Sequence, residues 1–191
     1  MTEPVVMQCS TVLTGPRQPG RDCAFAIPKH SYGCGDAQAV GQCAQDFRGP
    51  GRDSVVLRFG SIVGDDELTR WRLQRVRTGH PVGVGPPEAW THLVHVDDIG
   101  TSVVAALSAP SGLYNVGAQP VRRSEVAQVF ADAVGRDDSG FMSRLVHRLG
   151  GERLEPMCRS HRVSSNKFAQ EAAWKAKQPE FSVDWLAELV S

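Results

Sequence analysis

The chain has 191 residues, of which 41% are hydrophobic and 22% are charged, and this composition is typical of a globular protein with one sizeable core. Its 21 basic residues balance its 21 acidic residues. A chain without net charge does not attract nucleic acid or an anionic membrane surface through its overall field, so we expect neither as a partner. Any ligand is then recognised by local contacts.

The sequence predicts a cytoplasmic protein with free thiols. No apolar run approaches the roughly 20 residues that cross a bilayer. The first residues, MTEP, lack the basic and apolar regions of a signal peptide. The 5 cysteines are an odd number and form no CxxC pair, which argues against a disulfide framework and against a structural metal site.

The first third of the chain predicts two strands separated by a long loop and a helix. Residues 5–13 form an apolar segment that predicts a buried strand. The Gly and Pro residues that follow predict a loop over 15–36. A helix is expected over 37–47, and the β-branched residues of 54–59 predict the second strand.

The rest of the chain alternates helices with short extended segments. The expected helices cover residues 65–78, 98–107 and 123–134, followed by short helical segments near 141–149, 165–173 and 182–190. The expected extended segments cover 90–96 and 112–116. Asp97 or Asp98 is the predicted N-cap of the helix over 98–107, because a carboxylate accepts the N–H groups of the first turn.

This alternation predicts an α/β fold with a partial doubly wound parallel sheet, covered by helices on both faces. A complete doubly wound dinucleotide-binding sheet has about six strands and carries GxGxxG in its first βα turn. The glycine pairs at 33–35 and 83–85 do not follow a strand and open a helix, so they predict ordinary loops. We therefore expect only part of such a sheet.

Several short motifs follow one another in a recognisable order. Residues 9–15 have the sequence CSTVLTG, residues 32–36 YGCGD, 57–64 LRFGSIVG, 95–98 HVDD and 114–117 YNVG. In this order they resemble the SSxxVYG, YxxxK, LRxxNxxG, HVxD and YNVG motifs of the extended short-chain dehydrogenase/reductases, the NAD-dependent epimerase/dehydratase family. The resemblance begins at the fifth strand of that family, so it covers the C-terminal half only.

The resemblance implies two regions in the chain. Residues 1–135 correspond to a truncated Rossmann-like part with interleaved substrate-side elements, and residues 136–191 to a small, mainly helical C-terminal substrate region. The glycine-rich loop that binds the cofactor pyrophosphate in this family has no counterpart here. NAD or NADP is the cofactor of the intact family, and we expect this chain alone to bind it weakly.

The resemblance also implies a set of catalytic positions. Ser10 stands at the position of the family's serine, which hydrogen-bonds the reacting oxygen, and Tyr32 at that of the tyrosine, which moves a hydroxyl proton. Asp36 occupies the position of the lysine. A phenol has a pKa of about 10 and needs a nearby ammonium to form the phenolate near neutral pH. A carboxylate at this position opposes that step.

Further positions correspond to the family's cofactor and substrate contacts. Phe59 and Gly60 stand where the nicotinamide end is contacted. Ser61, Thr91 and His95 stand on the substrate side. Ser61 replaces an asparagine of the sugar epimerases, and Thr91 replaces a diphosphate-binding arginine in several of them. We therefore expect a small, sugar-like substrate without a specific indication of a nucleotide sugar.

The cluster around His92 and His95 has two alternative interpretations. Imidazole and carboxylate groups suit several divalent metals. In an extended segment, however, these two histidines point to opposite faces, so one ion does not easily bind both. We favour helix capping and hydrogen bonding, with a substrate-facing role as the second alternative and no metal.

A basic run on the helix over 65–78 also has two interpretations. Its members are Arg70, Arg72, Arg75 and Arg77. Cations near a helix C-terminus interact favourably with the helix dipole, which favours a solvated basic face. A phosphate-binding role is the alternative.

Two hypotheses for the function follow. The first is an NAD(P)-dependent epimerase/dehydratase-family, oxidoreductase-like protein that is weak or inactive alone and is completed by self-association or by a chain that supplies the missing half. The second is a non-catalytic, degenerate fragment or binding module of the same fold. The motifs do not distinguish NAD from NADP, because that choice is made after the family's second strand.

Overall fold

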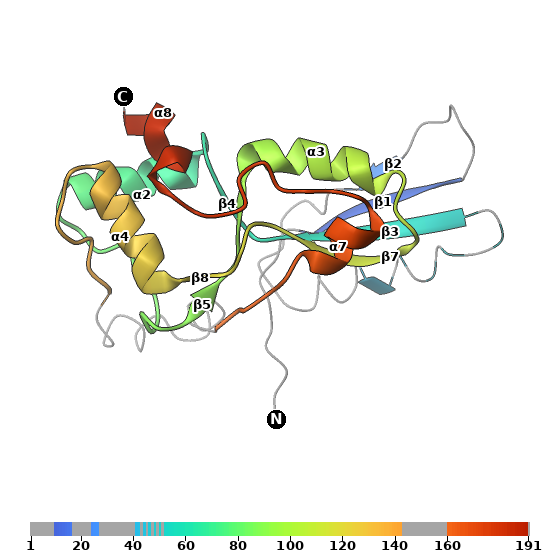
Figure 1. The fold of residues 1–191 in the computed structure, drawn as a ribbon, viewed down its shortest axis with the longest axis horizontal. Helices are drawn as coiled ribbons and strands as arrows, with labels where there is room; N and C mark the ends of the chain where they lie inside the picture. Colours follow the sequence, from blue (N-terminus) through green and yellow to red (C-terminus); the bar gives the residue numbers. More distant parts are fainter. Residues whose placement is uncertain are drawn as a thin grey trace.

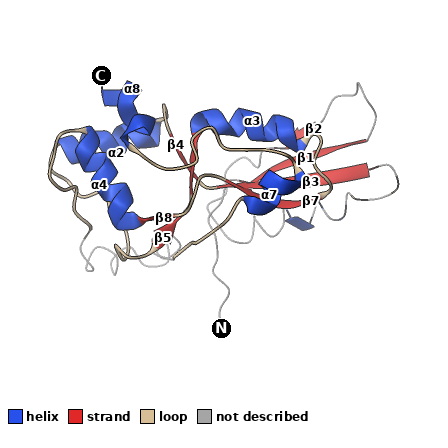
Figure 2. Cartoon of the chain, in the orientation of Figure 1, coloured by secondary structure: helices blue, strands red, loops and turns tan. Residues whose placement is uncertain are grey.

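The computed structural model describes residues 10–16, 24–26, 52–142 and 160–190, together with the single positions 41, 42, 44, 46, 48 and 50. These residues form an α/β fold with a four-stranded sheet and two small two-stranded sheets (Figures 1 and 2). The α/β class predicted from the sequence is confirmed. No described helix has the length and apolar character that spanning a membrane requires.

The main sheet has the strand order β2-β1-β3-β7. Strand β3 (Arg52–Phe59) contains the β-branched residues that predicted it, and it pairs in parallel with β7 (Gly112–Val116), with Phe59 opposite Val116. Val55 and Leu57 of β3 are buried. The predicted strands over 54–59 and 112–116 are thus confirmed as neighbours in one sheet.

The first two strands differ from the prediction. Strand β1 covers Ser10–Pro16, later than the predicted 5–13, and runs antiparallel to β3. Strand β2 (Ala24–Ala26) lies within the predicted loop and is antiparallel to β1. The segment between β1 and β2 is short enough for a hairpin, whereas a parallel pair needs a crossover of a dozen or more residues. The sheet is therefore mixed.

The predicted extended segment over 90–96 is divided into two short strands. Strand β5 (Trp90–Thr91) pairs antiparallel with β8 (Val121–Arg122). Strand β6 (Leu93–His95) pairs in parallel with β4 (Ser61–Val63). His92 lies between β5 and β6, and its carbonyl oxygen accepts a hydrogen bond of 2.8 Å from the Ser61 N–H. The two small sheets therefore meet at His92.

Two of the predicted helices are confirmed near their expected bounds. Helix α2 covers Glu67–Arg77 and helix α4 covers Arg123–Ala133. Asp66 is the N-cap of α2, and its carboxylate accepts hydrogen bonds from the N–H groups of Leu68 and Thr69. Such a cap satisfies N–H groups that have no partner inside the helix. Within the predicted helix over 37–47, residues 41, 42, 44 and 46 are helical.

Helix α3 (Val96–Ala106) begins earlier than predicted, and its N-cap is His95. The Nδ1 atom of His95 accepts a hydrogen bond of 3.3 Å from the Asp97 N–H, so the predicted cap by Asp97 or Asp98 is wrong. The Asp98 carboxylate is buried and accepts hydrogen bonds from the N–H groups of Lys177, at 2.8 Å, and Gln178, at 3.2 Å. Asp98 therefore fixes the C-terminal segment to α3.

The C-terminal segment 160–190 contains only short helices. Helix α7 covers Asn166–Glu171, the 3-10 helix η2 covers Val183–Leu186, and α8 covers Ala187–Val190. These agree with the segments predicted near 165–173 and 182–190. Residues 143–149 of the predicted segment 141–149 lie outside the described part of the chain.

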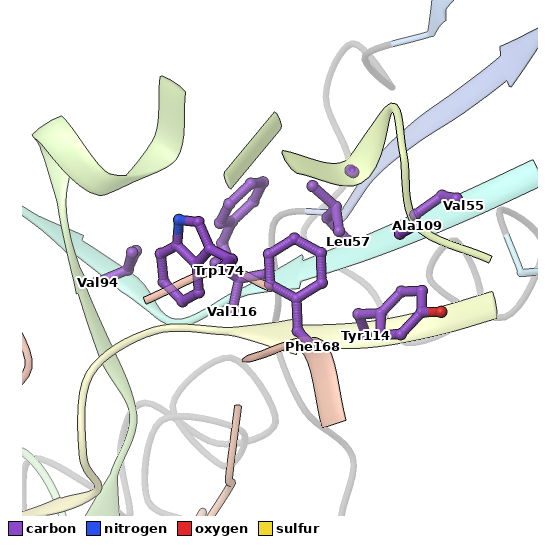
Figure 3. Close-up of a cluster of buried hydrophobic side chains, with 10 residues drawn as sticks. Val55, Leu57, Val94, Ala109, Tyr114, Val116, Phe168 and Trp174 are labelled. Carbon is purple, nitrogen blue, oxygen red and sulfur yellow. The ribbon is translucent and has the colours of Figure 1, made fainter. Parts of the chain in front are cut away.

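Two hydrophobic clusters form the core, and the C-terminal segment contributes to both. The first lies between the main sheet and helices α3 and α7 (Figure 3). In it, the Phe168 ring lies 5.4 Å, between ring centroids, from both Tyr114 and Trp174. The second cluster joins residues of α2, α4 and the C-terminal Trp185 and Leu186. The segment 160–190 is thus an integral part of the packing.

Candidate functional site

A cavity of about 210 Å³ lies where strand β3 ends, and residues of helices α2 and α4 and of the two small sheets line it. Its lining combines apolar side chains with a few polar and basic ones. The lining residues are Phe59, Gly60, Ser61, Arg72, Val82, Gly83, Val84, Thr91, His92, Leu93, Arg123, Val126, Ala127, Phe130, His161 and Val163. An apolar cavity with a few converging polar groups is the usual form of a small-molecule site.

The cavity begins where the backbone leaves the main sheet. The Gly60 N–H donates a hydrogen bond of 3.0 Å to the carbonyl oxygen of Val116, at the end of β7. A Cβ atom on Gly60 would lie 2.7 Å from the carbonyl oxygen of His92. Glycine thus permits the close backbone approach that places Phe59 and Ser61 in the cavity wall.

Replacement of Gly60 by alanine is expected to destabilise the fold by about 1–3 kcal/mol, because the added methyl group meets backbone atoms that cannot rotate away. Chemical denaturation measures this loss. Gly100→Ala is the matched control, since nothing lies within 4 Å of its added Cβ and alanine favours a helix. Equal effects of the two substitutions would contradict the steric argument.

One wall of the cavity is built from three segments that are distant in the sequence. Strands β5 and β8 pair with Trp90 opposite Arg122. The His161 N–H donates a hydrogen bond of 2.9 Å to the carbonyl oxygen of Trp90, which adds the C-terminal segment to the wall. Thr91 and His161 line the cavity.

The other side of this wall carries a stack of charged and aromatic groups. The guanidinium carbons of Arg122 and Arg162 lie 3.8 Å and 4.9 Å from the centroid of the Trp90 ring. Successive residues of an extended segment point to opposite faces, so Trp90 and Thr91 face opposite sides. The stack therefore braces the wall from outside the cavity.

His92 is the most deeply buried titratable group of the lining. Its side chain is 5% exposed, and this burial lowers its pKa to about 4. Among the described residues its Nδ1 atom has no hydrogen-bond partner, and its Nε2 atom lies 3.5 Å from Oγ of Ser165. An imidazole with these properties is neutral at neutral pH.

Arg72 brings a cation to the cavity from helix α2. It is half-buried and lines the cavity, whereas Arg70 and Arg77 of the same helix are exposed. Burial lowers the pKa of Arg72, and the charge of Asp66 partly opposes this effect. The prediction of one solvated basic face is therefore wrong for Arg72, because helix geometry turns this member of the run toward the cavity.

The cavity brings together four of the residues predicted from the sequence. Phe59, Gly60, Ser61 and Thr91 all belong to its lining. His95 does not. Its ring caps α3 and packs edge-on against Trp185, with ring centroids 5.1 Å apart.

The predicted catalytic residues are only partly described. Ser10 begins β1, with its Cα opposite that of Arg58, next to the end of β3. Its backbone thus lies at the same edge of the sheet as Phe59, although β1 runs antiparallel. Tyr32 and Asp36 lie outside the described residues.

The basic and histidine groups of the lining were not among the site residues predicted from the sequence. Arg123 and His161, from α4 and the C-terminal segment, were not considered at all. Arg72 was considered only within the basic run, with phosphate binding as the alternative, and His92 only within its cluster, with a substrate-facing role as the second alternative. Within the described part of the chain, no group of three His, Cys, Asp or Glu residues is arranged to hold a metal.

Several solved structures with a similar fold contain NAD or NADPH. A human epimerase family protein, SDR39U1 isoform 2 with NADPH, has a TM-score of 0.70 and 21% identity, covering 81% of this chain and 54% of that chain. dTDP-glucose 4,6-dehydratase from Bacillus anthracis, in complex with NAD, has a TM-score of 0.59 and 16% identity, covering 92% of this chain and 55% of that chain. The chain has the fold of these enzymes.

A third enzyme with this fold is UDP-glucose 4-epimerase from Thermotoga maritima with UDP-glucose, at a TM-score of 0.51 and 15% identity, covering 72% of this chain and 47% of that chain. The chain thus spans about half the length of these epimerase/dehydratase-family enzymes. No protein-family profile matches the sequence, and a search of curated proteins finds no similar sequence.

The described residues of this epimerase-like fold do not fit a complete nicotinamide dinucleotide. A cavity of about 210 Å³ is smaller than the ~300–1,000 Å³ of sites for drug-sized ligands. A dinucleotide also needs backbone N–H groups at a glycine-rich turn to bind its pyrophosphate. The glycines that line this cavity, Gly60 and Gly83, belong to no such turn.

Proposed function

We propose that this chain provides the substrate-binding half of an NAD(P)-dependent epimerase/dehydratase-family oxidoreductase, and that its cavity binds a small, oxygenated, sugar-like molecule. The observation that carries the proposal is the position of the cavity, at the carboxyl ends of the parallel strands β3 and β7. Ligands of α/β proteins bind at this edge of the sheet. The fold shared with epimerases and dehydratases supports the same assignment.

In this proposal the residues at the sheet edge have different roles. Phe59 and Gly60 contact the nicotinamide end of the cofactor, and Ser61 and Thr91 contact the substrate. Ser10 and Tyr32 are the catalytic residues, and the place of Ser10 beside the end of β3 supports a position near the cavity. No substrate contact is proposed for His95, because its ring is used to cap α3 and to pack on Trp185.

A nicotinamide dinucleotide requires a larger binding site than this cavity provides. Another chain would supply the glycine-rich half, which agrees with the small volume of the cavity. Self-association is the alternative partner state in this proposal. Asp36 at the lysine position makes the isolated chain weak or inactive in this proposal.

The test is binding of NADH and NADPH, followed by cofactor fluorescence and size-exclusion chromatography. The chain alone is expected to bind either cofactor weakly. A mixture with the separately produced N-terminal half of an epimerase-family enzyme is expected to form a complex that binds one of them. Asp36→Lys is expected to tighten this binding, and Asp137→Lys, at an exposed loop position, serves as the charge-matched control.

Two outcomes would contradict the proposal. In the first, the two halves elute as independent monomers and no cofactor binds to the mixture. In the second, Asp36→Lys and Asp137→Lys change cofactor binding equally, which would remove Asp36 from the neighbourhood of the cofactor.

The second candidate function is a non-catalytic binding module of the same fold. The observation that favours it is that described residues of this chain alone line the cavity with polar and basic as well as apolar groups. Ligand binding by the chain alone, without cofactor binding in the two-half mixture, distinguishes this function from the first.

A further inference from the structure

We propose that the outer face of helix α2 is an interface between two copies of this chain, in which the two α2 helices pack antiparallel about a two-fold axis at Trp71. The outer face consists of Glu67, Leu68, Trp71, Gln74 and Arg75. The proposal concerns a surface outside the cavity and does not depend on the proposed function. The dimer is separate from the association with a chain that supplies the glycine-rich half.

The first observation is that the two sides of α2 differ in burial. Thr69, Leu73 and Val76 are buried, and the last two belong to the second hydrophobic cluster. Helix geometry places Leu68 and Trp71 away from this buried side, and they are 46% and 50% exposed. Figure 1 shows α2 at the end of the molecule remote from β1 and β2. The apolar part of the outer face is thus open to a partner.

The second observation is the kind of side chain that this face exposes. Leu68 and Trp71 are three residues apart on a helix, so their side chains form one continuous apolar area. Adjoining apolar side chains on a surface mark sites of protein–protein contact. Tryptophan is enriched among the residues that contribute most to such contacts, and it lies near their centre. Trp71 is therefore the expected centre of an interface.

The third observation concerns the charges on either side of Trp71. Glu67 stands four residues before Trp71 and Arg75 four residues after it, so the three side chains form one row along the helix. Among the described residues, neither Glu67 nor Arg75 forms an ion pair. The row therefore has an unpaired anion at one end, an unpaired cation at the other and an aromatic ring between them.

This arrangement of charges identifies the partner as a second copy. A two-fold interface uses the same patch on both copies, so the patch must be complementary to itself. Antiparallel packing about Trp71 brings Glu67 of each copy opposite Arg75 of the other, and two ion pairs then flank the contact between the Trp71 rings. Parallel packing would bring like charges together, which opposes association.

Arg75 is already held in a position that suits the ion pair. Its guanidinium carbon lies 5.1 Å from the centroid of the Trp71 ring. Its Nε and Nη2 atoms donate hydrogen bonds of 3.3 Å and 3.2 Å to the carbonyl oxygen of Pro81, which leaves Nη1 for a carboxylate. A side chain that is fixed before binding loses little conformational entropy when the partner arrives.

The small size of the face predicts a weak dimer. Helix α2 has 11 residues, which at the usual rise of an α-helix gives a length of about 16 Å. We expect one pair of such helices to bury less than the roughly 1,200 Å² at which the range of stable interfaces begins. The expected dissociation constant is therefore about 10–100 μM.

Sedimentation equilibrium of the full chain, from about tenfold below to about tenfold above this range, tests the proposal. The average mass is expected to rise from that of one chain toward that of two. Trp71→Glu should weaken dimerisation at least about tenfold, as loss of a central aromatic contact does. Val104→Glu places the same charge at a 67% exposed position of α3 and, as the matched control, should leave dimerisation unchanged.

Two results of this experiment would overturn the proposal. One is a wild-type chain that remains monomeric over the whole concentration range. The other is an equal dissociation constant for Trp71→Glu and Val104→Glu, which would place any self-association on another surface.

Charge reversals test the antiparallel arrangement itself. Glu67→Arg and Arg75→Glu should each weaken the homodimer at least about tenfold, because each places like charges opposite one another at both contacts. A mixture of the two variants should form a heterodimer about as tight as the wild-type dimer, since residues 67 and 75 are then opposite in charge. A mixture that remains monomeric, with both variants folded by thermal melting, would contradict the arrangement. If Arg75→Glu does not fold, the comparison of Trp71→Glu with Val104→Glu decides.

Failure of this inference is distinguishable from failure of the proposed function. Dimerisation is measured on the chain alone and requires no cofactor, whereas the proposed function is tested by cofactor binding to the two-half mixture. A chain that remains monomeric refutes the α2 interface even if the mixture binds NADH or NADPH. A dimer that depends on Trp71, together with a mixture that binds neither cofactor, refutes only the proposed function.

Discussion

Acidification from pH 7 to pH 4 is expected to lower the free energy of unfolding by about 3 kcal/mol through His92 alone. Burial lowers the pKa of His92 in the folded chain from 6.5 to about 4. In the unfolded chain the imidazole regains its ordinary pKa, so between these two values the unfolded state binds more protons than the folded state. The contribution is therefore present above pH 6.5 and is lost progressively as the pH falls toward 4.

Urea denaturation at a series of pH values between 7 and 5 measures this effect. Most carboxylates are still ionised in this interval, and the loss of stability through His92 between pH 7 and pH 5 is about 2 kcal/mol. His92→Gln should remove it, which gives a flatter dependence of stability on pH, whereas His80→Gln, at an exposed turn, should not. Parallel curves for the wild type and His92→Gln would show that burial does not hold His92 neutral.

Phe168→Ala is expected to destabilise the fold by about 3–5 kcal/mol, the usual cost of removing a buried phenyl ring. The Phe168 side chain is 0% exposed and lies between the rings of Tyr114 and Trp174 (Figure 3). It is the main apolar contact of α7 with the sheet, so its loss leaves a cavity that the surrounding rings fill only partly. Thermal and urea denaturation measure the change.

Val104→Ala is the matched control for this substitution, because Val104 is 67% exposed on α3. Its effect should stay within about 0.5 kcal/mol, as for most surface substitutions. Hydrogen exchange adds a local readout, since Phe168→Ala should also increase exchange at the Lys177 N–H, which the same segment holds against Asp98. A loss no larger than that of Val104→Ala would show that α7 does not anchor the C-terminal segment.

The elements that the sequence predicted well have local causes. Helix α2 has an N-capping aspartate and basic residues in its last turn, and strand β3 is a β-branched apolar run. The direction of β1 has no such local cause, because it depends on which strand it meets. The N-cap of α3 depends on tertiary structure. The Asp98 carboxylate does not cap the helix, because it accepts hydrogen bonds from the N–H groups of Lys177 and Gln178, which are distant in the sequence.

The cavity was predictable where it follows the strand ends. Phe59, Gly60 and Ser61 adjoin the end of β3, and ordered motifs locate such residues. His161 was not predictable, because its contact with Trp90 joins segments that no local pattern relates.

Arg72 did leave a signal in the sequence. Thr69 and Val76 are buried on α2, and residues three and four apart share one face of a helix. Arg72 occupies the position between them, where an apolar residue would complete the buried face. A basic residue on the buried face of a helix predicts a cation that is held inside the protein. This pattern distinguishes Arg72 from Arg70 and Arg77, which lie on the exposed side of α2.

The hydrogen bond from His161 to Trp90 also determines when the cavity forms during folding. The wall that it completes brings together parts of the chain far apart in sequence, and closing such long loops costs entropy before any contact compensates for it. The cavity is therefore a late product of folding, and on the ribosome it cannot form until residue 161 has emerged. A ligand in the cavity then acts after the sheet is built, by slowing the release of the C-terminal segment.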